Sequence, residues 1–297
     1  MIYFYLYVII LFSMYLDLLL IEQALNKTQW HHLMASRYDK RAKNLTNETN
    51  HYPLLQHFRE IMSKQLCVLS NDNIDFPDPI NALDDPEGLL AIGGDLSTPR
   101  LLSAYQQAIF PWFSEGEPIL WWSPIERAII KPQEVYISKS MAKFIRQTTL
   151  TITINHAFSD VIDACALPRK TQAETWISPI IKKAYIALHQ IGSAHSIEVW
   201  DKDKLVGGLY GVNMGGVFCG ESMFHRHTNA SKLAFISLCK HFSAYQGQVV
   251  DCQMMTSHLA SLGVIANTRD NFIQQLKQTN NIVIDKSCWD KQIITLL

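Results

Sequence analysis

Hydrophobic and polar residues alternate along positions 195–224, and this period of two predicts three antiparallel β-strands. The strands are expected in the runs "HSIEVW", "LVGGLYGVN" and "VFCGESMF", with turns at "DKDK" and "MGG" between them. A helical pattern follows over 229–247 and ends at Gly247. The next residues predict a strand over 248–255 and a short capped helix over 256–263. The second half of the chain is therefore predicted to be α+β, with a central, mostly antiparallel sheet flanked by helices.

A smaller mixed unit is predicted ahead of this sheet. The run "LLAIGG" at 89–94 is typical of a short strand. The run "DLSTPRLLSAYQQ" at 95–107 predicts a helix, because Ser97 or Thr98 can cap its start and Pro99 suits its first turn. The aromatic-rich run "IFPWFSEGEPILWWSP" completes the unit.

The first 61 residues are expected to lie outside the functional protein. Their hydrophobic start lacks a basic flank and contains Asp17, so it is a poor signal peptide or membrane anchor. The polar residues that follow show no sustained periodicity, and Met62 is the expected first residue. The remaining chain is predicted to form a small N-terminal domain over 62–135 and a larger domain over 136–297, with no membrane association.

The charge and the cysteine content bear on nucleic-acid binding, on zinc binding and on the compartment in which the protein works. The chain has 26 Lys and Arg against 27 Asp and Glu, a net charge of -1, so contact with nucleic acid would need a local basic patch. The six cysteines are scattered singly and show neither a C-x-x-C pair nor the Cys/His spacing of a zinc site. They are typical of reduced core residues, which favours a reducing compartment such as the cytoplasm.

One such basic patch is predicted on a short helix. The run "ISKSMAKFIRQ" at 137–147 predicts a helix capped by Ser138. Its basic residues Lys139, Lys143 and Arg146 are spaced i, i+4 and i+7 and so share one face, which we call the basic stripe. A solvated helix face and a phosphate-binding surface are both compatible with this pattern.

An unusual carboxylate interrupts the third strand of the meander. Strict alternation would place Glu221 on the sheet face opposite Phe218, yet an unpaired buried charge is costly. Gly220 could form a β-bulge that turns the carboxylate toward the same pocket. An aromatic wall with a carboxylate at its mouth suits a ligand that has an apolar side chain beside a cation.

Two polar residues follow on the predicted strand over 248–255. Asp251 and Gln253 are two positions apart and would project from one face, while Cys252 would point to the other. Such a pair needs partners, which a structural hydrogen-bond network or a functional site could provide.

Other motifs are less specific. Tryptophans are frequent, and each could be a core residue or a stacking surface for a base; they include Trp112, Trp121, Trp122, Trp176 and Trp200. The run "AIGGDLS" lacks the spacing of a phosphate-binding loop and is interpreted as a turn. The run "HRH" at 225–227 has no companion ligands nearby, so no metal site is predicted.

Taken in order, these stretches resemble the bacterial leucyl/phenylalanyl-tRNA-protein transferase family. The similar runs are "GLLAIGGDLS", "LLSAYQQAIFPWFSEGEPILWWSP", "ETWIS", "HSIEVW", "LVGGLYGV", "FCGESMF", "NASKLAF" and "VDCQMMTSHLASLG". They span about 76–269, and so many rare motifs in one order make coincidence improbable. The resemblance implies a small N-terminal domain joined to a C-terminal domain like the acyl-CoA N-acyltransferases.

The resemblance also implies an activity. Members of this family transfer leucine or phenylalanine, and less readily methionine, from aminoacyl-tRNA to the N-terminal Arg or Lys of a protein, which marks that protein for N-end-rule degradation. The expected partners are therefore aminoacyl-tRNA and proteins with those N-termini, in the cytoplasm, and no cofactor is expected. By the same resemblance, the basic stripe is expected to contact tRNA phosphates.

Aromatic residues are implied at the tRNA end. By the family's motifs, Trp112 in "FPWF" and Trp176 in "ETWIS" would hold the terminal adenosine, with Tyr105 and Tyr185 nearby. Stacking on such rings contributes about 1 to 3 kcal/mol per base.

An apolar pocket is implied for the transferred side chain. It would be lined by Leu209, Phe218 and Val250, where the family often has methionine at the first position and isoleucine at the last. Apolar walls discriminate by only about 1 to 3 kcal/mol per methylene, in agreement with acceptance of both leucine and phenylalanine.

Three polar residues are implied at the acceptor end. Glu221 would face the cationic side chain, or the amine, of the acceptor's first residue. Gln253 would hydrogen-bond the attacking α-amine, and Asp251 would orient Gln253. The ester is already activated, so positioning could supply most of the acceleration.

Two other interpretations remain at this stage. An acyl-CoA-dependent N-acyltransferase could use the same architecture, but the [RQ]-x-x-G-x-[GA] pyrophosphate loop is replaced by "RHTNASK" where the helix over 229–247 begins. A non-catalytic tRNA-binding module would have no need of Glu221, Asp251 and Gln253, and an anchored surface protein stays an alternative if the first 25 residues belong to the protein.

Overall fold

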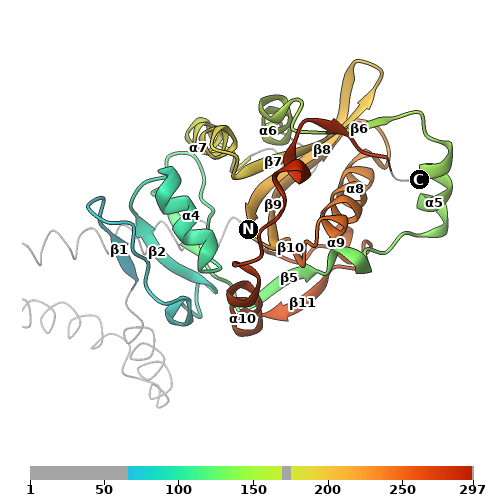
Figure 1. Cartoon of the computed structure of the whole chain (residues 1–297). Helices are drawn as coiled ribbons and strands as arrows, with labels where there is room; N and C mark the ends of the chain where they lie inside the picture. Colours follow the sequence, from blue (N-terminus) through green and yellow to red (C-terminus); the bar gives the residue numbers. More distant parts are fainter. Residues whose placement is uncertain (1–65, 169–174, 296–297) are drawn as a thin grey trace, which may run out of the picture. The chain divides into compact units, whose positions relative to one another are not determined.

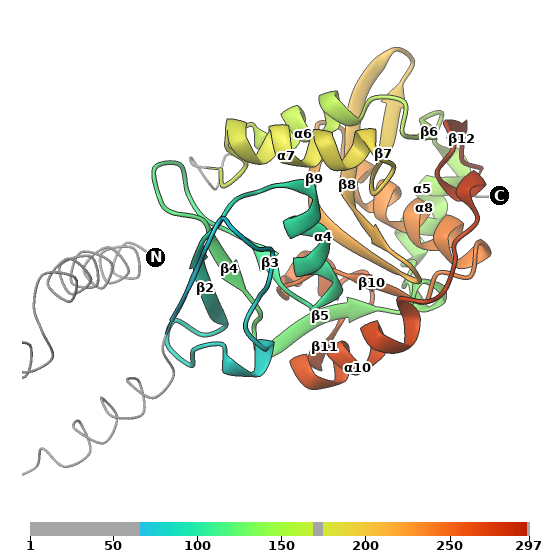
Figure 2. The same cartoon turned by 60° about the vertical axis from the view of Figure 1, so that its left-hand side comes forward.

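A computed structural model describes residues 66–168 and 175–295. The predicted extension over 1–61 and the predicted start at Met62 lie outside these residues. Residues Ile61–Leu297 form one compact unit, and its strands are arranged in two sheets (Figures 1 and 2).

The smaller sheet has the strand order β1-β2-β4-β3. Its strands are β1 (Cys67–Leu69), β2 (Leu89–Gly93), β3 (Phe110–Pro111) and β4 (Leu120–Trp122). The predicted helix is present as α4 (Thr98–Gln106), with Ser97 at its N-cap and Pro99 in its first turn. Gly93 and Gly94 both have a positive φ, so the run "AIGGDLS" contains the turn that was predicted for it.

The larger sheet has eight strands in the order β11-β5-β10-β9-β8-β7-β6-β12. They are β5 (Glu126–Ile130), β6 (Thr151–Ile154), β7 (Ala194–Asp201), β8 (Lys204–Met214), β9 (Val217–His225), β10 (Val249–Asp251), β11 (Ile265–Thr268) and β12 (Gln292–Ile293). The meander β7-β8-β9 is the one predicted from the alternating pattern. Among the described strands of this sheet only β9 and β10 pair in parallel, so the sheet is mostly antiparallel, as expected for this α+β fold.

Helices cover both faces of this sheet (Figures 1 and 2). Besides α4, the helices of the described chain are α5 (Lys139–Gln147), α6 (Phe158–Ala166), α7 (Pro179–Gln190), α8 (Ala230–Ala244), α9 (Ser257–Ala260) and α10 (Arg269–Thr279), with the short 3-10 helices η1 (Pro79–Asn81), which lies between β1 and β2, η2 (Pro132–Glu134) and η3 (Lys286–Trp289). Two neighbouring glycines in β8 show why the packing is close. A Cβ on Gly207 would lie 2.5 Å from the Cβ of Ala230 in α8, and one on Gly208 would lie 3.4 Å from Val161 in α6. Since successive residues of a strand point to opposite faces, α8 and α6 lie on opposite sides.

The predicted bulge is present at Glu221. In the pairing of β8 with β9, Tyr210 lies opposite Ser222 and Gly211 lies opposite Gly220, which leaves Glu221 as the extra residue. A β-bulge of this kind redirects a side chain relative to strict alternation.

One strand is shorter than predicted. The pattern over 248–255 predicts a strand that continues beyond residue 251, but β10 ends at Asp251 and Gln253 has a left-handed φ of 55°. The prediction that Asp251 and Gln253 project from one strand face is therefore wrong, because the chain turns between them.

Further features concern the cysteines, the helices and the predicted domain division. All six cysteines are free, and four of them are buried. Within residues 66–168 and 175–295, no helix combines the length and apolar character needed to span a lipid bilayer. The proposed division at residues 135 and 136 stays a prediction; β5, which precedes it, belongs to the larger sheet.

Candidate functional site

A hollow of about 150 Å³ lies where the two sheets meet. Its lining comes from β3 and the residue after it, the segment before α7, the bulge of β9, and the turn after β10. The lining residues are Phe110, Pro111, Trp112, Trp176, Glu221, Cys252, Gln253 and Met254. Four residues predicted for the site thus share one hollow, namely two tryptophans, the bulge carboxylate and the glutamine.

The Glu221 carboxylate is held by two tyrosines. Tyr105 in α4 donates a hydrogen bond to Oε1 at 2.7 Å, and Tyr185 in α7 donates one to Oε2 at 2.9 Å. Burial raises the pKa of Glu221 from 4.5 to about 7, and the two phenolic hydrogen bonds limit the rise. The carboxyl group is therefore divided between its neutral and ionised forms near pH 7.

The two tyrosines are fixed in the core. Both are almost fully buried, and burial followed by the charge of Glu221 raises the pKa of each phenol well above 10. They consequently keep their protons and remain hydrogen-bond donors. Their hydroxyls point at the carboxylate of Glu221, and the expectation that these tyrosines lie near the tRNA adenosine stays a prediction.

Gln253 sits in a turn that is fastened on two sides. Its backbone N–H donates to Oδ1 of Asp251 at 3.0 Å, and its carbonyl accepts from the N–H of Ala128 in β5 at 3.0 Å. The side-chain nitrogen of Gln253 has no hydrogen-bond partner in the described part of the chain, although it is buried. Such an amide gains a partner if a ligand enters the hollow.

Asp251 orients this turn but does not line the hollow. It is fully buried, and Arg127 in β5 donates to both of its carboxylate oxygens at 2.8 Å. Sequence reasoning missed Arg127. Its signal was a charged residue directly before the apolar run "AII" of the strand "ERAII", where a buried arginine needs a partner.

The tryptophans divide into core residues and site residues. Trp121 and Trp122 are buried, whereas Trp112 and Trp176 are half-buried at the hollow. Trp122 supports Trp112, because its Nε1 donates to the Trp112 carbonyl at 2.7 Å and the two rings pack edge to face. Trp200 lies elsewhere and donates to Thr153 Oγ1.

The three residues predicted for the side-chain pocket lie in the core. Leu209, Phe218 and Val250 are buried within the hydrophobic cluster of the larger sheet and do not line the hollow as it stands. Phe218 packs against the rings of Phe242 and Trp289. Their assignment to a pocket therefore stays a prediction.

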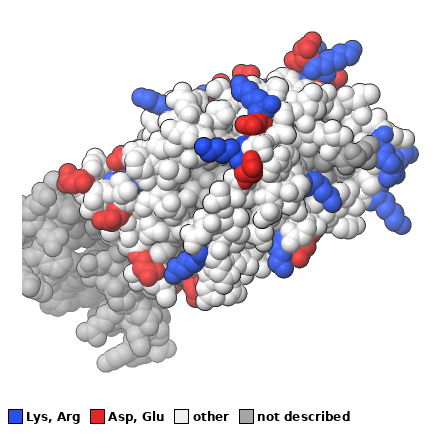
Figure 3. Space-filling model, in the orientation of Figure 1, with Lys and Arg blue, Asp and Glu red and all other residues white. Residues whose placement is uncertain are grey.

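The basic stripe is exposed on α5, away from the residues that line the hollow. Ser138 caps this helix, as expected, by accepting from the N–H of Met141. Lys139, Lys143 and Arg146 all face solvent. Lys and Arg side chains gather at the edge of the molecule where α5 lies (Figure 3).

The described residues contain no group of three side chains able to hold a metal ion. The run "HRH" lies exposed at the end of β9.

This chain is similar to known proteins over all the residues that line the hollow. The family model "Leucyl/phenylalanyl-tRNA protein transferase" matches residues 129–277, and the model of its N-terminal domain matches 94–125. The leucyl/phenylalanyl-tRNA–protein transferase of Psychromonas ingrahamii is 61% identical over 233 residues, which are 78% of this chain and 98% of that protein. Those of Pectobacterium carotovorum and Tolumonas auensis are 54% and 52% identical, over 76% and 74% of this chain and 95% and 94% of theirs. Every residue that lines the hollow falls within the segments matched by the two family models.

Proposed function

The chain belongs to the leucyl/phenylalanyl-tRNA protein transferase family, and we propose that it transfers leucine or phenylalanine, and less readily methionine, from aminoacyl-tRNA to the N-terminal Arg or Lys of acceptor proteins. It is an aminoacyltransferase. The observation that carries the proposal is the shared hollow, because it brings an aromatic wall, a carboxylate and an unpartnered amide within reach of one ligand. We further propose that the reaction takes place in the cytoplasm and marks the product for N-end-rule degradation.

The aromatic wall suits the end of the tRNA. Trp112 and Trp176 are half-buried and line the hollow, so their rings are accessible to an adenine. Stacking of this type contributes about 1 to 3 kcal/mol per base, and it does not depend on the sequence of the rest of the tRNA. The aminoacyl ester would then be directed inward, toward the apolar core in which Leu209, Phe218 and Val250 lie.

Glu221 suits the cationic first residue of the acceptor. A guanidinium or ammonium group favours the ionised carboxylate, so its arrival lowers the pKa of Glu221 from about 7. A neutral first residue gains no such contact, and the enzyme therefore distinguishes Arg and Lys from other N-termini.

Gln253 suits the attacking amine. Its side-chain carbonyl can accept a hydrogen bond from the α-amine and direct the lone pair at the ester carbonyl carbon. A new amide bond forms, the ester bond to the ribose oxygen breaks, and the ribose oxygen takes the proton that the amine releases. A neutral amide is a poor base, so the role of Gln253 is orientation.

The interpretation as an acyl-CoA-dependent enzyme has less support. α8 begins at Ala230 after Asn229 in a left-handed conformation, and no glycine-rich loop precedes it. Backbone N–H groups arranged to hold pyrophosphate would be needed at that position.

The test supplies one acyl donor at a time to a peptide that begins with Arg. Leucyl-, phenylalanyl- and methionyl-tRNA are compared with acetyl-CoA, and matched peptides that begin with Lys and Ala report acceptor choice. We expect labelling from leucyl- and phenylalanyl-tRNA, weaker labelling from methionyl-tRNA, and none of the Ala peptide. Labelling from acetyl-CoA alone would overturn the proposal.

A further inference from the structure

Arg127 in β5 occupies a central position between the two sheets. Only 2% of its surface is exposed, yet it lies outside the lining of the hollow. Its guanidinium is held between the rings of Phe110 and Phe272, each with its centroid 4.8 Å away. All three guanidinium nitrogens donate hydrogen bonds, so the group has one defined orientation.

Two of these bonds lead to one wall of the hollow. Nε and Nη2 donate to the two carboxylate oxygens of Asp251, both at 2.8 Å. Asp251 Oδ1 accepts in turn from the backbone N–H of Gln253, which has a left-handed φ. Non-glycine residues adopt this conformation rarely, so the hydrogen bond to Asp251 helps to hold the glutamine there.

The third bond leads to another part of the lining, on the side of β3. Nη1 donates to the carbonyl of Ala108 at 2.9 Å, and Ala108 also has a left-handed φ, of 63°. This residue precedes β3, which begins with Phe110 under the guanidinium and leads directly to Trp112. Arg127 thus holds the strand that leads to Trp112.

We propose that Arg127 is a positioning residue that fixes the distance between the aromatic wall around Trp112 and the amide of Gln253. The inference rests on the proposed function, in which one wall binds the ester and the other orients the amine. Since attack requires the amine and the ester carbon at a near-contact distance, a small change in this separation lowers the turnover. Glu221 is held by hydrogen bonds from its two tyrosines, and Arg127 acts on it only through its charge, which lowers the pKa of the carboxyl group. A lysine at position 127 keeps that charge, so recognition of the cationic residue should survive the exchange.

The test variant is Arg127→Lys. Lysine keeps the positive charge beside Asp251, but one ammonium group cannot reproduce the planar fork to the carboxylate together with the bond to Ala108. We expect kcat for leucyl transfer to fall at least tenfold in the full-length chain. The KM for the Arg-initiated peptide should stay within twofold of wild type.

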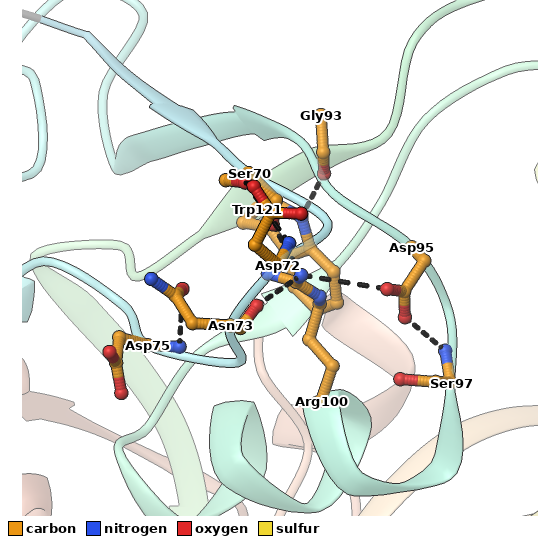
Figure 4. A network of polar contacts seen from close by, with 9 residues as sticks. All are labelled: Ser70, Asp72, Asn73, Asp75, Gly93, Asp95, Ser97, Arg100 and Trp121. Atoms are coloured by element: carbon orange, nitrogen blue, oxygen red, sulfur yellow. Dashed lines mark hydrogen bonds and ion pairs between the residues drawn. The ribbon is translucent and has the colours of Figure 1, made fainter.

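Arg100 offers a matched control. It is also fully buried, and its Nη2 donates to the carbonyls of Ser70 and Asn73 at 2.6 Å, with Asp95 at 3.5 Å (Figure 4). None of these partners lines the hollow. Arg100→Lys is expected to lower the melting temperature while kcat stays within twofold of wild type.

A double-mutant cycle separates positioning from general destabilisation. If Arg127 acts through Asp251, the variant with both Arg127→Lys and Asp251→Asn should have the same kcat as the less active of the two single variants. Losses that multiply, or an Arg127→Lys enzyme with kcat within twofold of wild type, would overturn the proposal.

A second variant and the wild-type result complete the test. If Arg127→Lys fails to fold, Arg127→Met combined with Asp251→Leu replaces the buried pair by apolar side chains, an exchange that folded proteins tolerate. This variant should fold and lose at least tenfold in kcat, and a loss under threefold would contradict the inference. A wild-type enzyme that labels no Arg peptide would reject the proposed function, whereas normal labelling by both wild type and Arg127→Lys would reject only the role of Arg127.

Discussion

At the scale of single residues, the site combines a carboxyl group whose pKa is raised by burial with two phenolic hydroxyls whose hydrogen bonds stabilise its ionised form. Glu221 gains its raised pKa mainly from burial, while Tyr105 and Tyr185 stabilise the charged form. A carboxylate in water would bind any cation weakly, whereas one that is removed from water interacts more strongly with the cation that reaches it. Under the proposed function, the acceptor is thus recognised by the charge that it brings into the hollow.

The first prediction concerns pH. Because the pKa is raised, Glu221 is mostly protonated below pH 7 and mostly ionised above it, so recognition of an Arg N-terminus should improve as pH rises. We expect the ratio of kcat/KM between wild type and Glu221→Gln to rise about tenfold from pH 6 to pH 8 and then to level off. Ionisation of the peptide's own amine affects both enzymes and cancels in the ratio. A ratio that does not change with pH would contradict this role.

The second prediction concerns Gln253. Gln253→Ala should lower kcat more than tenfold, since the amine loses its orienting partner. The melting temperature should stay within a few degrees of wild type, because the side-chain nitrogen makes no hydrogen bond within the described part of the chain. Thermal unfolding and single-turnover transfer measure the two effects. Gln274→Ala, an exposed position on α10, is the control and should change neither.

The sequence indicates which residues are chemically active better than it indicates what holds them. Glu221 and Gln253 stand out because each breaks an apolar pattern. Their supports are distant in sequence, however, with Tyr105 116 residues before Glu221 and Arg127 124 residues before Asp251. Pairing across such separations depends on the packing of several elements, which no local pattern encodes.

At the scale of elements, the strands and helices with strong periodicity were predicted, and those set by tertiary contacts were not. The meander, α4, α5, α8 and α9 occur where the pattern and the capping residues place them. The helices α6, α7 and α10 were not predicted, and β10 is shorter than its apolar pattern suggested. That strand ends early because the turn at Gln253 is bound to β5, so a tertiary contact overrides the local preference.

The third prediction tests α5. Replacing Lys139, Lys143 and Arg146 together by Gln should weaken tRNA binding and reduce the slope of log Kd against log salt by about two to three, one for each phosphate that is no longer neutralised. Filter binding over a range of KCl concentrations measures the slope. Lys277→Gln, an exposed change on α10, should leave it unaltered. An unchanged slope in the triple variant would identify the stripe as an ordinary solvated helix face.

At the scale of the whole molecule, the site is shared between the two sheets. The smaller sheet supplies Phe110 and leads to Trp112, α4 supplies one tyrosine, and the segment before α7 supplies Trp176. The larger sheet supplies the carboxylate and the glutamine turn. Composition and patterning could predict both units, but not that β5, four residues after β4, enters the larger sheet next to β10. The hollow exists because of this connection.

The fourth prediction concerns the length of chain that activity requires. Residues Ile61–Leu297 form a compact unit, and the Psychromonas ingrahamii relative matches 233 residues, 98% of its own length. A chain that starts at Met62 should therefore retain kcat and KM within twofold of the full-length chain, in the assay with leucyl-tRNA and an Arg peptide. Its melting temperature should also be unchanged. A large loss of activity in a folded truncated chain would assign a role to residues 1–61.

The placement of the tryptophans offers a spectroscopic consequence. Trp112 and Trp176 are half-buried at the hollow, whereas Trp121 and Trp122 are enclosed in the core. Adenine stacked on an indole quenches its fluorescence, and the accessible rings emit at longer wavelengths than the enclosed ones. Under the proposed function, the unlabelled protein thus contains its own optical reporter. Loss of part of the red-shifted emission, to which the half-buried Trp200 and Trp289 also contribute, would follow nucleoside occupancy in real time.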